Sequence, residues 1–137
     1  MINAVNGYNV WVNDQDEALD FYVGVLGMTK TADIDLGFMR WLTVSAPGAT
    51  QPNLVLCPLT LAGLDADQQR QAQQLLARGI LGAVFLTSDD VHATYDALVA
   101  AGAESVQPPT EQSYGLDCAV RDPFGNQIRI GSLTDRD

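Results

Sequence analysis

An arginine in the middle of an otherwise apolar strand is the side chain in this sequence with the clearest potential for chemistry. The stretch RDPFGNQIRI, residues 121–130, starts with turn-forming residues and continues into an alternating run that is typical of a strand. Alternation places Ile128 and Ile130 on one face and Arg129 on the other. The Arg129 guanidinium could point into water, pair with a carboxylate, or receive an anionic or carbonyl-bearing ligand through its planar fork of donors.

Residues for other kinds of chemistry are missing from the sequence. Cys57 and Cys118 lie in apolar runs with no histidine that the sequence places near them, which favours inert packing thiols. His92, the chain's only histidine, follows Val91 in a predicted helix, where a solvated position is expected. The paired aspartates lie at predicted helix starts, where capping explains them. The sequence therefore shows no nucleophile–base pair.

Size and charge limit the class of protein. The 137 residues are 47% hydrophobic and 18% charged, which is ordinary for one globular domain. A net charge of −10 would repel phosphates, so we expect neither nucleic acid nor an anionic membrane as a partner. No apolar run approaches the ~20 residues of a membrane span. The N-terminus lacks a secretory pattern, and together with the isolated cysteines this predicts a cytoplasmic protein.

One strand–helix unit is used twice along the chain. The strand GYNVWVND leads into a helix that starts at Asp14, has a capping-box partner in Glu17 and ends at Gly27. The stretch AVFLTSDDVHATYDALVAAGA repeats this order, with an equally long helix from Asp89 to Gly102. The apolar stripes that would face a sheet are Ala18, Phe21, Tyr22 and Val25 in the first helix and Val91, Tyr95 and Leu98 in the second.

A third predicted helix, at about residues 64–79, lies between the two units. In LDADQQRQAQQLLARG, Asp65 and Gln68 resemble a capping box and Gly79 ends the helix. Its narrow apolar stripe consists of Ala72, Leu75 and Leu76. The many glutamines favour a solvated connector, and the alternative is a lid or an element at a subunit contact.

Five stretches in this order resemble the vicinal oxygen chelate superfamily, which includes glyoxalase I, extradiol dioxygenases and bleomycin-resistance-type binding proteins. They are VWVNDQDEALDFYVGVLGM, RWLTVSAPG, FLTSDDVHATYDALVAAGAE, PPTEQSYGL and RDPFGNQIRI. The resemblance implies an α+β fold of two βαβββ modules whose sheets curl into a cup. Module 1 would span about residues 1–58 and module 2 about residues 80–132 of a single domain.

The resemblance also indicates where a metal would bind. In the family's metalloenzymes, the first and last strand of each module supply His, Gln or Glu ligands to a divalent ion that acts as a Lewis acid. These positions fall on Gly7, on Gly82 or Ala83, on Asn53 or Val55, and on Arg129. Glycine, alanine and valine offer no donor, an Asn carbonyl is weak, and a guanidinium repels a cation. We therefore expect neither a metal nor another cofactor.

The cup would instead hold a ligand. Trp11 shares the parity of Gly7, and a glycine there leaves room for a ligand ring. Trp and Tyr offer large stacking faces with one polar group each. Alternation leaves open whether Arg40 or Trp41 faces inward, and whether Arg129 binds ligand or pairs with an acid such as Glu111 or Asp117. The expected ligand-binding residues are Gly7, Trp11, Trp41, Asn53, Tyr114 and Arg129.

These expectations favour a metal-free binding protein that holds an aromatic or anionic small molecule, and they leave its status as an enzyme open. The alternative is a metal-dependent lyase, isomerase or dioxygenase of the glyoxalase type with a displaced metal site. A third hypothesis uses Arg129 to stabilise an oxyanion and a carboxylate as base, without a metal. The resemblance also implies a homodimer, to whose pocket a partner chain could contribute.

Overall fold

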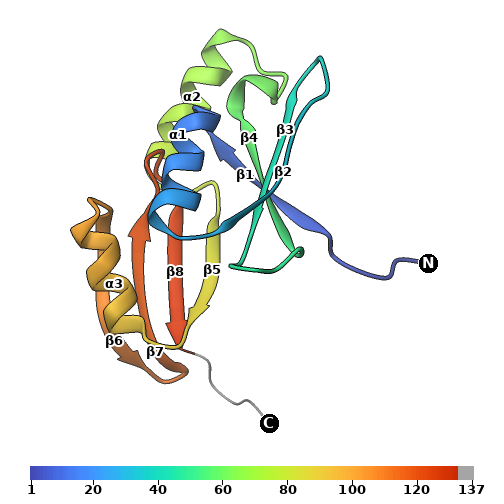
Figure 1. The fold of residues 1–137 in the computed structure, drawn as a ribbon. Coiled ribbons are helices and arrows are strands. Elements are labelled where there is room, and N and C mark those ends of the chain that lie inside the picture. Colours follow the sequence, from blue (N-terminus) through green and yellow to red (C-terminus); the bar gives the residue numbers. More distant parts are fainter. Residues whose placement is uncertain (133–137) are drawn as a thin grey trace. The chain divides into compact units, whose positions relative to one another are not determined.

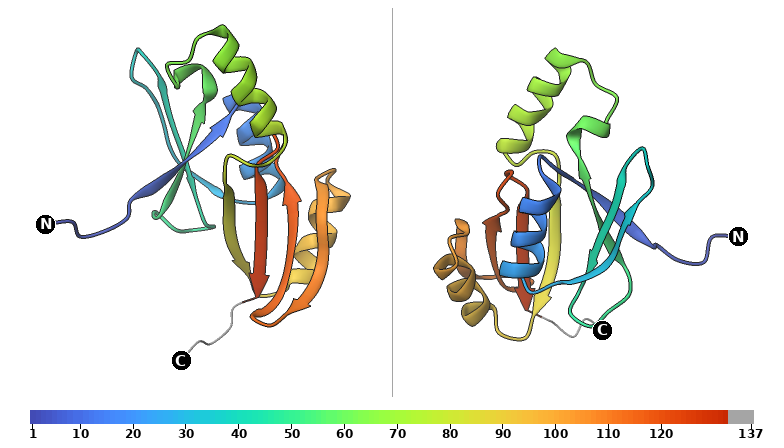
Figure 2. Two further views of the ribbon diagram at one scale, coloured as in Figure 1. Left: turned by 180° about the vertical axis from the view of Figure 1, so that it is seen from behind. Right: turned by 45° about the horizontal axis from the view of Figure 1, so that its top comes forward.

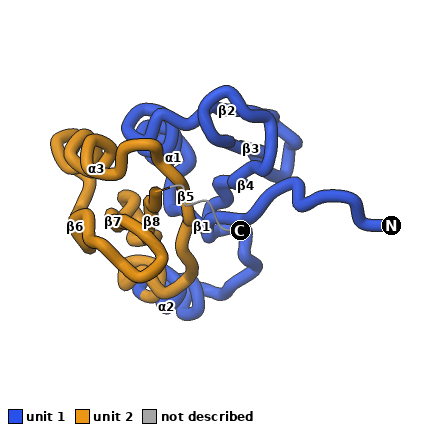
Figure 3. The backbone as a smooth tube through the Cα atoms, turned by 90° about the horizontal axis from the view of Figure 1, so that it is seen from below, with its two compact units in different colours: residues 1–74 blue, residues 75–137 orange. Residues whose placement is uncertain are grey.

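The computed structural model describes residues 1–132 and divides the chain into two compact units, residues 1–74 and 75–137 (Figure 3). Each unit contains one four-stranded mixed sheet, with strand order β1-β4-β3-β2 in the first and β5-β8-β7-β6 in the second. The predicted α+β class with two βαβββ modules is therefore confirmed.

The elements follow one another in the same order in both modules (Figure 1). Module 1 contains strand β1 (Gly7–Val12), helix α1 (Gln15–Leu19) with its π-helical continuation η1 (Asp20–Val25), and strands β2 (Thr29–Asp35), β3 (Arg40–Ser45) and β4 (Asn53–Pro58). The short 3-10 helix η2 (Leu59–Leu61) and helix α2 (Ala66–Ala77) come next. Module 2 contains strand β5 (Ala83–Ser88), helix α3 (Val91–Ala100), and strands β6 (Glu104–Gln112), β7 (Gly115–Arg121) and β8 (Gln127–Ser132).

In each sheet the first and last strands of the module are parallel neighbours. β1 pairs with β4 so that Gly7 lies opposite Asn53, and β5 pairs with β8 so that Phe85 lies opposite Arg129. The remaining pairs are antiparallel hairpin neighbours, as Figure 2 shows from two further sides. Residues that open a module are thereby placed beside residues that close it.

Apolar residues at alternate strand positions build the core of each sheet. Val10 and Val12 of β1 are buried, as are Ile128 and Ile130 of β8, which confirms the alternation expected for the last strand. The turn before β8 is fixed by Asp122, whose Oδ1 accepts hydrogen bonds from the backbone N–H groups of Phe124, Gly125 and Asn126. These bonds are consistent with the turn residues predicted from the sequence.

The first and connecting helices start with the predicted caps. Asp14 accepts a hydrogen bond from the N–H of Glu17 at 2.8 Å. Asp65 and Gln68 form a reciprocal capping box, in which each side chain accepts from the other residue's backbone N–H, at 2.8 and 3.2 Å. Beyond Leu19 the first helix continues as a π-helix, which the sequence did not indicate.

Two details differ from the sequence prediction. The cap of α3 is Asp90 rather than Asp89, because the Asp90 side chain accepts from the Ala93 N–H while the Ser88 hydroxyl accepts from the Asp90 N–H. In α2, Leu76 is fully buried but Leu75 is exposed, so the apolar stripe is narrower than expected. Within the described residues no helix is long and apolar enough to cross a membrane.

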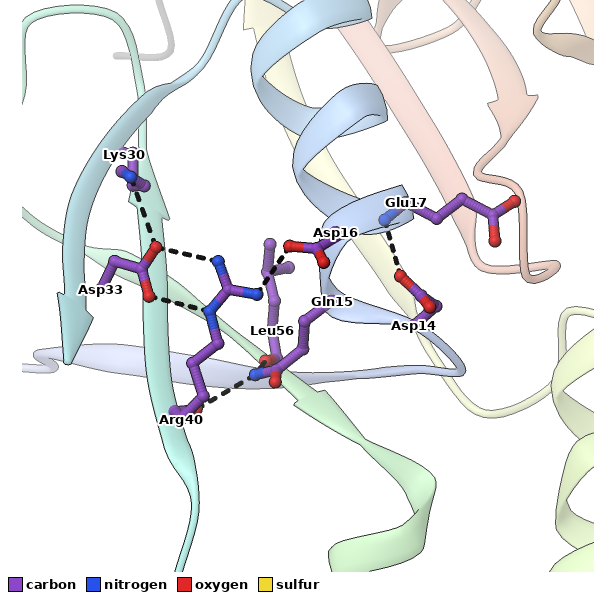
Figure 4. Close-up of polar contacts among 8 residues, drawn as sticks. All are labelled: Asp14, Gln15, Asp16, Glu17, Lys30, Asp33, Arg40 and Leu56. Carbon is purple, nitrogen blue, oxygen red and sulfur yellow. Dashed lines mark hydrogen bonds and ion pairs between the residues drawn. The ribbon is translucent and has the colours of Figure 1, made fainter. Parts of the chain in front are cut away.

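A network of charges joins α1 to the strands of module 1 (Figure 4). Arg40 donates two hydrogen bonds to Asp33, at 2.8 and 2.9 Å, and a third to Asp16 at 2.8 Å. Gln15 donates to the backbone carbonyls of Arg40 and Leu56, which ties the start of α1 to β3 and β4. The hydrogen bond from Arg40, with a smaller contribution from Lys30, lowers the pKa of Asp33 to about 2.

We expect this network to make stability depend on acid pH. A carboxyl whose pKa is lowered on folding stabilises the fold above its unfolded pKa, 3.8 for Asp33, and loses that contribution as pH falls toward about 2. Asp33→Asn should therefore flatten the pH dependence of the urea midpoint in that window. Asp89→Asn, at an exposed aspartate outside the network, is the control, and an unchanged profile in Asp33→Asn would contradict this account.

Candidate functional site

Strand β3 presents Trp41 and Thr43 to a pocket on the sheet of residues 1–74, which we call the unit-1 pocket. The pocket has a volume of about 800 Å³. Arg40 points to the opposite face, where it is bound to Asp33 and to Asp16 of α1. The sequence left open which of Arg40 and Trp41 faces inward, and the structure places Trp41 at the pocket. The lining also includes Gly7, Thr31, Asn53 and Val55.

The glycine at the start of β1 allows a close approach between two backbones. A Cβ atom on Gly7 would lie 2.8 Å from the carbonyl oxygen of Asn53, its partner in the parallel pair. Cβ atoms essentially never approach another atom this closely, so a larger residue requires the strand to move. Gly7 therefore lies at the pocket as expected, and the structure adds a packing reason for the glycine.

A chain of hydroxyl and amide groups covers the floor of the unit-1 pocket. The Thr31 hydroxyl donates to Asn53 Oδ1 at 2.5 Å, and it lies 2.7 Å from the Thr43 hydroxyl. Because Thr31 uses its single proton toward Asn53, Thr43 must donate to Thr31. Asn53 in turn donates to the Thr50 carbonyl at 3.1 Å. Asn53 is thus held by hydrogen bonds in a neutral network.

Sequence reasoning overlooked both threonines because alternation alone does not show which polar side chains meet across strands. The signal that was available is Thr43, a polar residue in the otherwise apolar run WLTV of β3. The structure buries Thr43 almost completely. A buried hydroxyl requires a partner, and that partner indicates which strand lies alongside.

The tryptophan expected on β1 has a different environment. Trp11 is half-buried and lies in register with Cys57 of β4, at the end of the strand pair that is remote from Gly7. It is not among the residues that line the unit-1 pocket. Its predicted contact with a ligand therefore remains a prediction.

Four polar side chains converge on the sheet of residues 75–137. Arg129 Nη2 donates to Asp117 Oδ2 at 2.6 Å and to Gln107 Oε1 at 3.2 Å. Gln107 Nε2 donates to Asp117 Oδ1 at 2.9 Å, and the Tyr114 hydroxyl donates to Asp117 Oδ2 at 3.0 Å. Of the two acids considered from the sequence, Asp117 is therefore the partner of Arg129. Arg129, Asp117 and Tyr114 also line a pocket of about 300 Å³, the unit-2 pocket.

The contacts of Asp117 keep it ionised. Burial by itself would raise the pKa of this carboxyl, but the hydrogen bonds from Arg129, Gln107 and Tyr114 outweigh burial and hold the pKa below its usual value. The hydrogen bond to Asp117 likewise raises the pKa of Arg129. The pair is therefore a guanidinium and a carboxylate at neutral pH.

Phe85 is a pocket residue that the sequence analysis did not identify. It lies in register with Arg129, lines the unit-2 pocket, and is 76% exposed. The available signal was its position in AVFLTS, directly after Val84, whose side chain is buried. Strand alternation turns Phe85 away from that core, and a large aromatic on an open face is unusual enough to be noticed.

The register of the two sheets identifies the strand positions that correspond between modules. Val55 lies opposite Asn9 in β4–β1, just as Arg129 lies opposite Phe85 in β8–β5. Val55 and Arg129, like Gly7 and Ala83 at the starts of β1 and β5, are poor ligands for a divalent metal. Among residues 1–132 no group of three or more His, Cys, Asp and Glu side chains could hold a metal ion.

Comparison with known proteins agrees with this arrangement. The model of the Glyoxalase/Bleomycin resistance protein/Dioxygenase superfamily matches residues 4–130, which confirms the resemblance read from the sequence. A protein from Shewanella frigidimarina is 34% identical over 130 residues, which cover 91% of this chain and 90% of that protein. The structure of UcmS2 is similar with a TM-score of 0.88 at 30% identity, covering 96% of this chain and 98% of UcmS2. TnmS3, described as an antibiotic binding protein from Streptomyces sp. CB03234, gives a TM-score of 0.76 at 29% identity, covering 97% and 98%.

The close approach at Gly7 gives a test of the unit-1 geometry. We expect Gly7→Ala to lower the free energy of unfolding by roughly 1–3 kcal/mol, because the added methyl group forces β1 away from the Asn53 carbonyl. Gly24→Ala is the matched control: no atom lies within 4 Å of the added Cβ, and we expect no loss of stability. Chemical denaturation of both variants measures the difference, and equal stabilities would show that the strands are not closely packed there.

Proposed function

We propose that this chain, which belongs to the Glyoxalase/Bleomycin resistance protein/Dioxygenase superfamily, binds a small aromatic or anionic molecule without a metal ion. The observation that carries the proposal is the position of Arg129 and its contact with Asp117. By the family resemblance, the strand position of Arg129 corresponds to that of a metal-binding carboxylate, and Arg129 is bound to Asp117 at the wall of a pocket. A guanidinium at this position disfavours a divalent cation and favours a ligand with hydrogen-bond acceptors.

Each of the two pockets has its own set of groups with which it could bind such a ligand. The unit-1 pocket offers the indole of Trp41 and the amide of Asn53. The unit-2 pocket offers Tyr114 and Arg129. Aromatic surface with a few fixed polar groups is the usual composition of a small-molecule site. The similarity to TnmS3, an antibiotic binding protein, supports the same class of function.

The proposal predicts that the protein, purified without chelator, contains no stoichiometric metal and binds none of Ni, Mn, Fe or Zn in calorimetry. It also predicts that a library of aromatic and anionic compounds contains ligands that bind one-to-one. Trp41→Ala should weaken binding roughly tenfold or more, because it removes the largest apolar side chain of the unit-1 pocket.

The control for Trp41→Ala is Tyr8→Ala. Tyr8 is an exposed aromatic residue that strand alternation places on the face of β1 opposite to Gly7. Its replacement should leave affinity unchanged. A tight one-to-one metal site would overturn the proposal in favour of a metal-dependent lyase, isomerase or dioxygenase.

We further propose that the protein is a cytoplasmic homodimer. The family resemblance supports pairing, and so do large apolar side chains left exposed in the second unit, among them Ile80 and Val99. Cys57 and Cys118 are buried free thiols, which fits a reducing compartment.

Sedimentation should give a mass of about twice 14.7 kDa at micromolar concentration. Replacement of Ile80 by Lys should shift the population toward the monomer, because a charge on that exposed apolar position opposes burial. The control is Glu104→Lys, because Glu104 is exposed and already carries a charge. A monomer at all accessible concentrations would contradict the dimer.

A further inference from the structure

The guanidinium of Arg129 has N–H donors that its two hydrogen bonds leave unused. Both of its protein hydrogen bonds come from Nη2, which donates to Asp117 and Gln107. Apart from a weaker interaction of the guanidinium with the Tyr114 hydroxyl, Nε and Nη1 have no partner within residues 1–132, and the side chain keeps 25% of its surface exposed. An arginine has five N–H donors, so about three remain for a ligand in the unit-2 pocket.

The unit-2 pocket as a whole carries no net charge. Among the described residues that line it, Asp117 and Arg129 are the only formally charged ones, and they are joined at 2.6 Å. A ligand anion at Nη1 of Arg129 would face the nearby carboxylate of Asp117 in a chain whose net charge is already −10. A neutral carbonyl oxygen accepts the same N–H groups without losing the hydration of a full charge. The charge balance therefore favours a neutral acceptor.

Two aromatic rings border the same pocket. Phe85 is 76% exposed and lies beside Arg129 in the β5–β8 pair. Tyr114 is 50% exposed, and its hydroxyl is already engaged by Asp117, so its ring is the part that remains available. An open phenyl ring next to an unused N–H donor of Arg129 suits a flat molecule that stacks on the ring and accepts a hydrogen bond at its edge.

From these contacts we infer that the unit-2 pocket selects planar aromatic molecules bearing a neutral carbonyl over the corresponding carboxylates, with Phe85 as the stacking residue and Nη1 of Arg129 as the donor. This inference rests on the proposed function and narrows its ligand class from aromatic or anionic to aromatic and neutral. Asp117 acts as the positioning and charge-balancing residue.

Three compounds of one shape test the inference on the wild-type protein: naphthalene-2-carboxamide, naphthalene-2-carboxylate and 2-ethylnaphthalene. An amide-resolved NMR titration at neutral pH reports both the affinity and the strands affected. We expect the carboxamide to shift amides of β5, β7 and β8 and to bind about tenfold more tightly than each of the other two, a difference of ~1.4 kcal/mol. Preferential binding of the carboxylate would overturn the inference and leave the proposed function standing.

Two variants separate the contribution of the Asp117 charge from that of the Arg129 donors. Asp117→Asn retains the size of the side chain but removes its charge, so affinity for the carboxylate should rise about tenfold while that for the carboxamide changes little. Arg129→Gln should abolish the advantage of the carboxamide over 2-ethylnaphthalene. Should either variant fail to fold, the wild-type ranking of the three compounds still decides the inference.

The stacking role has a matched control within the chain. Phe85→Leu should weaken binding of all three compounds about fivefold, whereas Phe38→Leu should not, although Phe38 is equally exposed at 77% and lies outside the unit-2 pocket. Equal effects of the two variants would overturn the role of Phe85. Failure of all three compounds to shift β5, β7 or β8 would overturn the whole inference, while ligands found in the wider library at the unit-1 pocket would still support the proposed function.

Discussion

Parallel pairing between the first and last strand of each module is the constraint on which both pockets depend. The pairing brings Gly7 beside Asn53 and Phe85 beside Arg129, residues that are separated in the chain by most of a module. Hairpin neighbours then add the remaining polar groups, with Thr43 opposite Val55 and Asp117 opposite Gly131. Because side chains alternate along each strand, one fixed register decides the composition of a whole face.

The two modules share this framework but place different chemistry on it. Module 1 has a neutral chain of hydroxyls and an amide, Thr43 to Thr31 to Asn53, whose donors and acceptors largely satisfy one another. Module 2 has the ionised pair of Arg129 and Asp117, and the Arg129 guanidinium keeps N–H donors that a ligand could use. The duplicated fold thus offers one face suited to recognising a ligand by its shape and one face suited to binding it through directed hydrogen bonds. Charge balance, rather than a high density of charge, characterises the second face.

Local sequence patterns predicted the features that short-range physics controls. The caps at Asp14 and Asp65, the buried alternation of Ile128 and Ile130, and the repeated strand–helix unit each depend on residues a few positions apart. Prediction was less accurate where two adjacent residues can perform the same task. Ser88 accepts from the Asp90 N–H and so shifts the cap of α3 by one residue, a choice that propensity alone cannot make.

The sequence by itself determined the α+β class, the duplicated modules, the family and the placement of Arg129 on the face of the last strand opposite to Ile128 and Ile130. Tertiary structure alone decided that Trp41 rather than Arg40 faces the unit-1 pocket, that Asp117 rather than Glu111 pairs with Arg129, and that Phe85 lies open beside it. The physical reason is the range of the interactions. Periodicity and capping act within a few residues, whereas the partner of a strand side chain is set by which distant strand lies alongside and in which register.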